Sequence, residues 1–527
     1  MPEAYDLIVI GGGHNGLVCA AYLARAGLSV CVLERRPVVG GGVITEEVTL
    51  PGFKHNTCSN VHGWIHYGPV YKDLELERLG AAYIFPDKPF GAIFPDGTGL
   101  IFYSNLRRIE EEIGKFSRRD AEAFHQLHEE FTRFKDYVRS FLFLPPTPPA
   151  TVPALLQGTQ DGRELLRFMM SNARNIVHER FEDERVRACL LMQITQAGIS
   201  SDMYGSGMFV PAQVVLEGGW GLAVGGSGNL ALAMRRAVEE QGGVVRTGCH
   251  VAKLGLNGGR VEAAYLEDGT RLEARRAVAS NLEPKQTFLR LVGVEHLPAE
   301  VVRQVERWRP AEAALFTVHL ALEEAPRWRA AASQPDLNQC WAVCAGLSSS
   351  ADLDSQFADI RMGIPPRRIG FLAVTPTLYD PSQAPPGKHT MLLWQYAPSR
   401  LGSGGVDAWD QAKEGYADKI LEVLRDYAPN MTPDVILARH VISPRDLERK
   451  NISMIGGDFS AGELSQDQMG IFRPIHGYGP NRSPIPNLFL CGPSTHPGGS
   501  VGGACGYNAA NAIAEELGLK KWWQRRG

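Results

Sequence analysis

The 527-residue sequence lacks any apolar run of about 18 residues, the length that a membrane-spanning helix needs. Its first apolar stretch, from Tyr5 to Ile10, has neither the basic region nor the cleavage site of a signal peptide. Basic runs that would follow a phosphate backbone are also absent, and the formal net charge is only −4. These absences predict a cytoplasmic protein that does not bind nucleic acid.

Signals for metal binding are equally scarce. The nine cysteines include no C-x-x-C pair, which argues against a disulfide framework and against a structural zinc site. His55, His62 and His66 lie near Cys58, but their spacing matches no standard metal site. We therefore predict no metal, and we expect these side chains either to line a substrate pocket or to pack in the interior.

The C-terminal segment LKKWWQRRG, from Leu519 to Gly527, mixes four cations with two tryptophans. Such a mixture suits a membrane interface, where the indole rings lie at headgroup depth and the cations meet anionic lipid. It suits a solvated helix tail nearly as well. Peripheral membrane contact is therefore one of two interpretations of this segment.

A nucleotide-binding pattern opens the chain. The apolar run YDLIVI precedes GGGHNG, then LVCAAYLARAG at helical spacing, then SVCVLE, which predicts strand, tight turn, helix and strand. Gly11, Gly13 and Gly16 would let backbone N–H groups meet a pyrophosphate at the positive end of the helix, and Glu34 would accept ribose hydroxyls. An acid at Glu34 favours FAD or NAD over NADP, although Arg35 beside it complicates that choice.

A second glycine pattern, at Gly226, Gly228 and Ala231, also precedes a helical stretch. The run before it, GLAV, is short, and the run after its helix, VVRTGCHV, ends without an acid. A dinucleotide-binding unit needs both a clean strand before the turn and an acid after the helix. We therefore predict no separate NAD(P) domain.

The rest of the chain divides into segments that differ in composition and hydrophobic pattern. A charged helical pattern from residue 106 to about residue 136 is followed by the proline-rich FLPPTPPATVP and by further helical sequence. Alternating apolar runs between residues 307 and 443, with one strong helix, predict an antiparallel sheet with helices packed on it. Length and a composition of 44% hydrophobic and 21% charged residues predict two or more packed units.

Near the C-terminus, six of the sixteen residues in CGPSTHPGGSVGGACG, from Cys491 to Gly506, are glycine. Glycine is costly wherever chain entropy is lost, so such a cluster indicates that backbone comes close to a ligand or to another segment. Together with YDLIVIGGGHNGLVCAAYLARAGLSVCVLERRPVVGG at the start, this end of the chain resembles the phytoene-desaturase-like FAD-dependent oxidoreductases. Within them it resembles the branch of desaturase-type β-carotene ketolases and pyridine-nucleotide-disulfide-oxidoreductase-domain proteins. The resemblance covers roughly the first and last sixty residues, and GFKHNTCS from Gly52 departs from an aspartate and glycine common in relatives.

The resemblance implies an α/β fold with a Rossmann-type FAD-binding domain of amine-oxidase type, interrupted by an α+β substrate domain. It places the FAD-binding domain at residues 1–105, 210–300 and 470–520, the substrate-binding domain at 106–209 and 301–469, and a basic aromatic tail at 521–527. It also implies which residues bind FAD: Gly11, Gly13, Gly16, Glu34, Arg35, Gly41, Gly42, Val251, Gly492, Gly502 and Gly503.

His496 lies within the C-terminal glycine-rich segment and is the candidate catalytic residue. It has three interpretations: a general acid or base, a ring contact for flavin or substrate, or a side chain that bonds to backbone. Arg473 and Asp467 lie just upstream, where internal salt bridging is favoured over catalysis.

The resemblance implies oxidation of an apolar, isoprenoid or carotenoid-like small molecule by hydride transfer to flavin. With no second nucleotide domain, oxygen or a quinone is expected to accept the electrons. Three alternatives stay open: a polyene cis–trans isomerase, a prenyl-binding escort protein without redox chemistry, and an amine oxidase. The last would place aromatic side chains beside the flavin, for which Trp64, Tyr67 and Tyr507 are candidates.

Overall fold

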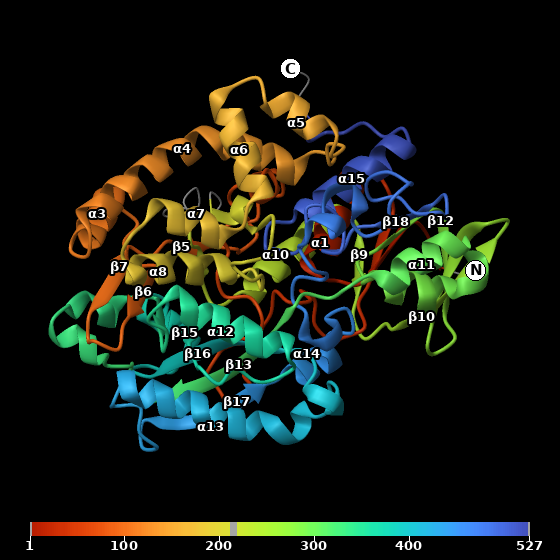
Figure 1. Ribbon diagram of the computed structural model, residues 1–527. Coiled ribbons are helices and arrows are strands. Elements are labelled where there is room, and N and C mark those ends of the chain that lie inside the picture. The colour runs from red at the N-terminus through yellow and green to blue at the C-terminus, as the bar shows by residue number, and fades with distance from the viewer. Residues whose placement is uncertain (1–2, 211–218, 525–527) are drawn as a thin grey trace.

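The computed structural model describes residues 3–210 and 219–524 and contains two seven-stranded sheets (Figure 1). The first sheet has the order β10–β11–β12–β1–β2–β9, and β18 pairs with β12 outside this path. Pairings among β9, β2, β1, β12 and β18 are parallel, as the predicted α/β unit requires. Its strands are β1 (Glu3–Ile10), β2 (Val30–Leu33), β9 (Val244–Arg246), β10 (Val251–Asn257), β11 (Arg260–Leu266), β12 (Arg271–Ser280) and β18 (Leu488–Leu490).

Alternation along β1 explains how this sheet is buried on both faces. Leu7 and Val9 join one apolar cluster, whereas Ile8 and Ile10 join another on the opposite face. Strands of a parallel sheet covered on both faces are expected to be apolar throughout, which the sequence VCVL of β2 satisfies. The helices on the first face are α1 (His14–Arg25), α10 (Gly228–Glu239) and α15 (Ala504–Glu516), and η2 (Lys285–Gly293) and α11 (Ala299–Arg307) lie on the second.

The second sheet has the order β17–β13–β16–β15–β14–β6–β7 and is antiparallel except where β14 pairs with β6. Its strands are β6 (Phe90–Ile93), β7 (Gly99–Phe102), β13 (Ala313–Leu322), β14 (Ala342–Ala345), β15 (Phe371–Val374), β16 (His389–Pro398) and β17 (Ile436–Ile442). The helices that follow its strands are α12 (Ser350–Arg361), α13 (Trp409–Tyr427) and α14 (Pro444–Lys450). The predicted sheet with helices between residues 307 and 443 is thus present.

Aromatic packing holds helix α13 against the second sheet. The Trp409 ring of α13 lies 5.3 Å from the Phe316 ring of β13, and its indole N–H donates to the carbonyl of Pro398. Figure 1 shows α13 in light blue along one side of the sheet, with the yellow helices on the other. A buried tryptophan contributes most when its N–H is also satisfied, as here.

Six helices between residues 106 and 195 form a separate layer, drawn in orange and yellow in Figure 1. Five of them are preceded by an N-cap residue, Asn105, Ser117, Thr159, Asn172 or Asp183, whose side chain accepts hydrogen bonds from backbone N–H groups of the first turn. These caps explain why the charged helical pattern breaks where it does. The helices are α3 (Leu106–Gly114), α4 (Arg118–Phe143), α5 (Thr151–Leu156), α6 (Gln160–Met170), α7 (Ala173–Arg180) and α8 (Glu184–Thr195).

Short elements connect the two sheets. They are α2 (Val70–Asp73) and the paired strands β3 (Thr45–Glu46) with β4 (His55–Asn56) and β5 (Tyr83–Ile84) with β8 (Leu222–Ala223). The predicted domain boundary at residue 105 assigns β6 and β7 to the FAD-binding part, whereas in the structure they are strands of the second sheet. Residues 211–218 and 525–527, which fall in two predicted segments, lie outside the described residues.

The aromatic residues of the C-terminal segment pack against helix α1. The rings of Trp522 and Trp523 lie 5.3 and 5.1 Å from the ring of Tyr22, and the guanidinium of Arg25 lies 3.9 Å from the Trp522 ring centroid. The Trp523 indole N–H donates to the side chain of Asn511. Both rings are therefore engaged within the protein. Within the part of the chain that the structure describes, no helix is long and apolar enough to cross a bilayer.

Candidate functional site

A cavity of about 330 Å³ is lined by residues of both sheets. On the first sheet it meets Ile10 and Leu33, at the carboxyl ends of β1 and β2, where open α/β sheets bind their ligands. On the second sheet it meets Leu372 and Val374 of β15 and Trp394 of β16. The cavity therefore has one wall at the strand ends of the first sheet, which we call the nucleotide-binding wall after the role predicted from the sequence, and one apolar wall.

The glycine turn between β1 and α1 forms one edge of the cavity. Gly11 and Gly13 line it, and Gly11 has a φ of +93°, which favours glycine. A Cβ at Gly16 would lie closer than 3.0 Å to the carbonyl oxygen of Gly11, so the turn closes only with glycine there. Gly13 caps α1 without a side-chain bond, and the first N–H groups of a helix have no acceptor within it. These donors suit an anion at the cavity edge.

Glu34 lines the cavity with its carboxylate held in place. The backbone N–H groups of Gly12 and Arg36 each donate to one carboxylate oxygen, at 2.8 Å in both cases. Arg35 also lines the cavity, but its guanidinium donates to the backbone carbonyl of Lys450 at 3.0 Å. The Glu34 carboxylate, the predicted ribose acceptor, is thus held at the cavity edge, while Arg35 joins this wall to the end of α14.

Gly41, Gly42 and Val251 are brought to the same cavity. Gly41 has a φ of +63°, and a Cβ there would lie 3.2 Å from the Cα of Gly13, so the two glycine-rich turns touch. A Cβ at Gly42 would lie 3.2 Å from the sulfur of Cys58, another cavity residue. Val251 begins β10 and is buried. The predicted residues of the N-terminal half, apart from Gly16 behind the turn, therefore gather around one space.

The C-terminal glycines lie differently. Gly492, Gly502 and Gly503 do not line the cavity; Pro493 and residues 499–501 do. A Cβ at Gly492 would lie 2.6 Å from the carbonyl oxygen of Asn281, and Gly503 caps α15 with a φ of +72°. These glycines thus approach other parts of the protein, backbone at Gly492 and mainly side chains at Gly502 and Gly503, which the sequence pattern alone did not distinguish from approach to a ligand.

His496 is buried outside the cavity lining. Its Nε2 lies 2.6 Å from the carbonyl oxygen of Phe141, at the end of α4, and donates to it. Burial lowers the pKa of His496 to about 4, so the ring is neutral at neutral pH. Of the three interpretations of this residue, bonding to backbone is the one that the geometry displays.

Two further cavity residues were not predicted from the sequence. His14 occupies a variable position of the glycine motif, and its Nε2 lies 3.0 Å from the carbonyl oxygen of Ser500, which joins the two ends of the chain. Burial lowers its pKa to about 4. Asn281 follows β12 and donates to the carbonyl of Gly11 at 3.2 Å, while its Oδ1 is buried without a partner among the described residues. Only the position after a strand end could have indicated Asn281.

The three histidines near Cys58 do not line the cavity, although Cys58 and Trp64 do. His55 bonds to Thr49, and His62 bonds to Tyr83 at 2.7 Å. Burial lowers the pKa of His55 to about 4 and that of His62 to about 3. No group of three potential metal ligands occurs in residues 3–210 and 219–524.

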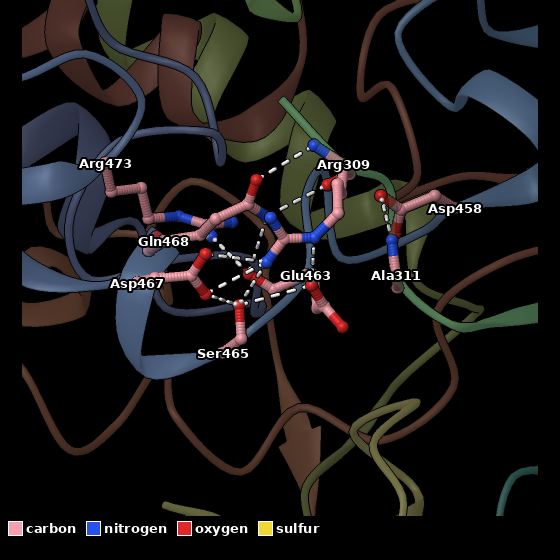
Figure 2. Close-up of polar contacts among 8 residues, drawn as sticks. All are labelled: Arg309, Ala311, Asp458, Glu463, Ser465, Asp467, Gln468 and Arg473. Carbon is pink, nitrogen blue, oxygen red and sulfur yellow. Dashed lines mark hydrogen bonds and ion pairs between the residues drawn. The ribbon is translucent and has the colours of Figure 1, made fainter. Parts of the chain in front are cut away.

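Arg473 and Asp467 were both expected to form internal salt bridges. They do not pair with each other, and only Asp467 forms a salt bridge (Figure 2). Asp467 pairs with Arg309 at 2.9 Å, so it does form a salt bridge. The buried guanidinium of Arg473 instead donates to six backbone carbonyls and has no carboxylate in hydrogen-bonding distance in the described chain. Those carbonyls belong to residues 460–463, Gln468 and Pro493. Arg473 thereby joins two cavity-lining segments, at residues 459–461 and at Pro493.

Of the three aromatic residues named for amine oxidation, only Trp64 lines the cavity. Tyr67 packs edge-on against Trp64, and Tyr507 packs against Tyr22. Glu34 is the sole carboxylate among the lining residues that the structure describes, and it belongs to the nucleotide-binding wall. An ammonium group would find no counter-ion at the apolar wall.

Comparison with known proteins gives matches along nearly the whole chain. A family model described as flavin containing amine oxidoreductase matches residues 16–514. Pyridine nucleotide-disulfide oxidoreductase domain-containing protein 2 of Mus musculus is 32% identical, over 98% of this chain and 94% of that protein. One of the limonene dehydrogenase subunits of Castellaniella defragrans is 31% identical, over 98% of this chain and 96% of that protein. The solved structure of a redesigned putrescine oxidase, 14% identical, has a TM-score of 0.62 over 98% of this chain and all of that one.

Proposed function

The chain belongs to the family of flavin-containing amine oxidoreductases, and on that basis we propose that it dehydrogenates a largely apolar, isoprenoid-like small molecule. Family membership confirms the predicted resemblance, the amine-oxidase type of fold, FAD as the cofactor and an oxidoreductase activity. The substrate class goes beyond family membership and is our proposal. One relative is named for limonene, an isoprenoid hydrocarbon, which supports that class.

The observation that carries the proposal is the division of the cavity into two unlike walls. The wall opposite the glycine turns includes the apolar side chains of Leu372, Val374, Trp394 and Phe459. Apolar side chains of this kind bind a substrate by removing its hydrocarbon surface from water, which contributes about 25 cal/mol for each Å² buried. They also keep water away from the reacting carbon.

The nucleotide-binding wall would hold FAD by three kinds of group. The first-turn N–H groups of α1 would bind the pyrophosphate, the Glu34 carboxylate would accept from ribose hydroxyls, and the glycine backbone would allow close approach. FAD, when bound, supplies the oxidant that accepts a hydride from a substrate C–H bond. The proposed FAD-binding residues remain those named from the sequence, with Gly16, Gly492, Gly502 and Gly503 acting from behind the cavity surface.

We propose that His496 positions a loop and exchanges no proton with substrate. Its Nε2 is occupied by the Phe141 carbonyl, and its pKa of about 4 would leave it neutral during turnover. The bond ties the C-terminal segment, whose residues 499–501 line the cavity, to the end of α4. Substrate dehydrogenation would then depend on placement over the cofactor more than on side-chain acid–base catalysis.

Oxygen or a quinone is the proposed electron acceptor. The second glycine pattern leads through α10 into β9, a strand of the same sheet that pairs with β2. That helix is therefore part of the first nucleotide-binding unit and gives no support to a second one. Peripheral membrane contact through the C-terminal segment is not included in the proposal, because both of its tryptophans pack on α1.

The test is anaerobic reduction of the FAD-loaded protein. An isoprenoid substrate should bleach the flavin absorbance near its visible maximum, and mass analysis should show a product lighter by two hydrogens. Anaerobic reduction of the flavin by simple amines, and none by isoprenoids, would contradict the proposal. An isomerised polyene of unchanged mass would contradict it in favour of isomerase chemistry.

A further inference from the structure

Gln196 lies at the apolar wall of the cavity, directly after helix α8. The chain around it is packed against the same wall: the Ser460 hydroxyl donates to the carbonyl of Ala197 at 3.2 Å. A Cβ at Gly198 would lie 3.1 Å from the Phe459 ring. Since Ala197, Phe459 and Ser460 all line the cavity, the place of Gln196 beside them is well defined.

The side chain of Gln196 carries an unmet hydrogen-bonding group. Its Nε2 is buried and has no partner among the described residues. Leaving a buried donor unpaired costs about 1 to 3 kcal/mol, so native proteins retain such groups rarely and each one needs an explanation. Gln193 has the same unpaired Nε2 but does not line the cavity, so it is the cavity position of Gln196, and not the unpaired group alone, that makes a ligand its available partner.

The surroundings of Gln196 restrict what that partner can be. Of the charged residues that line the cavity, Glu34, Arg35, Arg36 and Arg290 come from the segments around the first sheet, and Lys450 comes from the end of α14. Lys450 is itself paired with Glu46 and bonded to Thr57. Neither an anion nor a cation on the substrate would thus meet an opposite charge beside Gln196, and a neutral polar group is the complement of an amide.

We propose that Gln196 is a specificity-determining residue that binds a neutral oxygen function, a hydroxyl or a carbonyl, on the substrate. The substrate is then an oxygenated isoprenoid and not a hydrocarbon. This inference rests on the proposed function and narrows it. Sites built to bind a polar substrate group discriminate strongly against the analogue that lacks it, because the buried site group is then left unpaired.

The test compares matched ligands on the FAD-loaded protein. Geraniol, farnesol and geranylgeraniol are each paired with the hydrocarbon of the same skeleton that lacks the hydroxyl. Binding is followed by quenching of tryptophan fluorescence, because Trp220 and Trp394 line the cavity. At least one alcohol should bind about tenfold more tightly than its hydrocarbon, the scale of one added hydrogen bond to a buried group.

Two variants of nearly equal volume change separate a ligand contact from a general effect. Gln196→Met should abolish the preference for the alcohol. Gln193→Met is the matched control: Gln193 precedes Gln196 by about one helical turn and also has an unpaired buried Nε2, but it does not line the cavity. It should leave the preference intact, and urea unfolding of both variants reports any loss of stability.

The inference is overturned if wild-type protein binds every hydrocarbon as tightly as its alcohol, or if Gln196→Met keeps the preference. Because binding to wild type is measured first, this test holds even where a variant fails to fold. Anaerobic flavin reduction by the same ligands keeps the two proposals apart. Reduction by hydrocarbons and alcohols alike would sustain the proposed function and overturn the role of Gln196, whereas no reduction by any isoprenoid would overturn the function itself.

Discussion

At the scale of single residues, the site depends on positions where one added or removed group changes what can fit. Gly16 and Arg473 illustrate the two opposite requirements, a position that admits no side chain and a position that needs a large one. The first is required because nothing larger than hydrogen fits behind the glycine turn. The second is required because a buried guanidinium satisfies carbonyls that no neighbouring donor could reach at once.

Gly16→Ala should abolish FAD binding, because its Cβ would clash with the Gly11 carbonyl oxygen and force the turn open. Flavin absorbance of the purified protein, after reconstitution with excess FAD, is the measurement. The control is Gly415→Ala within α13, where an added Cβ would meet no atom within 4 Å. That change should retain FAD and raise the free energy of unfolding by about 0.5 to 1 kcal/mol, as alanine favours a helix. Normal FAD affinity in Gly16→Ala would contradict the geometry of the turn.

Arg473→Met should lower the free energy of unfolding by about 3 kcal/mol, because the buried carbonyls lose a charged donor and have no water to replace it. Arg473→Lys should restore little, since an ammonium has three donors and no planar fork. Urea unfolding monitored by circular dichroism measures both changes. Arg309→Gln serves as the control: its side chain is 49% exposed, and loss of its pair with Asp467 should cost less than about 1 kcal/mol. An equal loss of unfolding free energy in Arg473→Met and Arg309→Gln would show that the buried hydrogen bonds of Arg473 stabilise the fold no more than an exposed ion pair.

At the scale of elements, helix α1 carries the site. The N-terminus of α1 lines the cavity. Near this end α1 packs closely on α15, because a Cβ at Gly506 would come closer than 3.0 Å to the carbonyl oxygen of Asn15. The other end of α1 receives the two C-terminal tryptophans around Tyr22. The helix is thus held at both ends by segments almost five hundred residues away in the sequence.

Trp523→Ala should lower the free energy of unfolding by about 3 kcal/mol, as expected for removing a large buried ring. Its binding to anionic lipid vesicles, measured by co-sedimentation, should equal that of the unchanged protein, because the ring packs on Tyr22 and not on a lipid surface. Lys520→Ala, at an exposed position of the same segment, should change stability by less than about 0.5 kcal/mol. A loss of vesicle binding in Trp523→Ala with unchanged stability would restore the membrane interpretation of the segment.

At the scale of the whole molecule, burial of uncharged histidines makes stability depend on pH. Burial lowers the pKa of His14, His55 and His496 to about 4 and that of His62 to about 3, against 6.5 in an unfolded chain. Between about pH 6.5 and about pH 4 the unfolded chain therefore binds more protons than the folded one. The free energy of unfolding must fall as pH falls through this window.

The slope rises as pH falls below about 6.5 and approaches about 1.4 kcal/mol per pH unit for each of these histidines near about pH 5, and it is read from urea unfolding between about pH 7 and pH 5. His62→Gln should reduce the slope by the share of one histidine. His125→Gln should not reduce it, since His125 lies on the surface beside Glu110 and its pKa is raised. Equal stability across the window would show that these histidines are protonated in the folded protein.

Much of the fold and of the nucleotide-binding wall could be predicted from the sequence. The glycine turn, Gly41, Gly42 and Glu34 lie within about forty residues of one another, and strand, turn and helix signals there are local. The second sheet was also predicted as a region, although the place of β6 and β7 in it was not. Pairing of β6 with β14 joins residues about 250 apart, and no local pattern indicates it.

The sequence by itself therefore determined the family, the glycine turn between β1 and α1 and the presence of two sheets, because these depend on short-range spacing. Only the tertiary structure decided which side chains share the cavity. It placed His496 on a backbone carbonyl, separated Arg473 from Asp467, turned the C-terminal tryptophans onto α1 and brought Gln196 to the apolar wall. Apart from the bonds of Arg473, these outcomes depend on contacts between segments more than a hundred residues apart, where packing and the pairing of buried polar groups decide the partner.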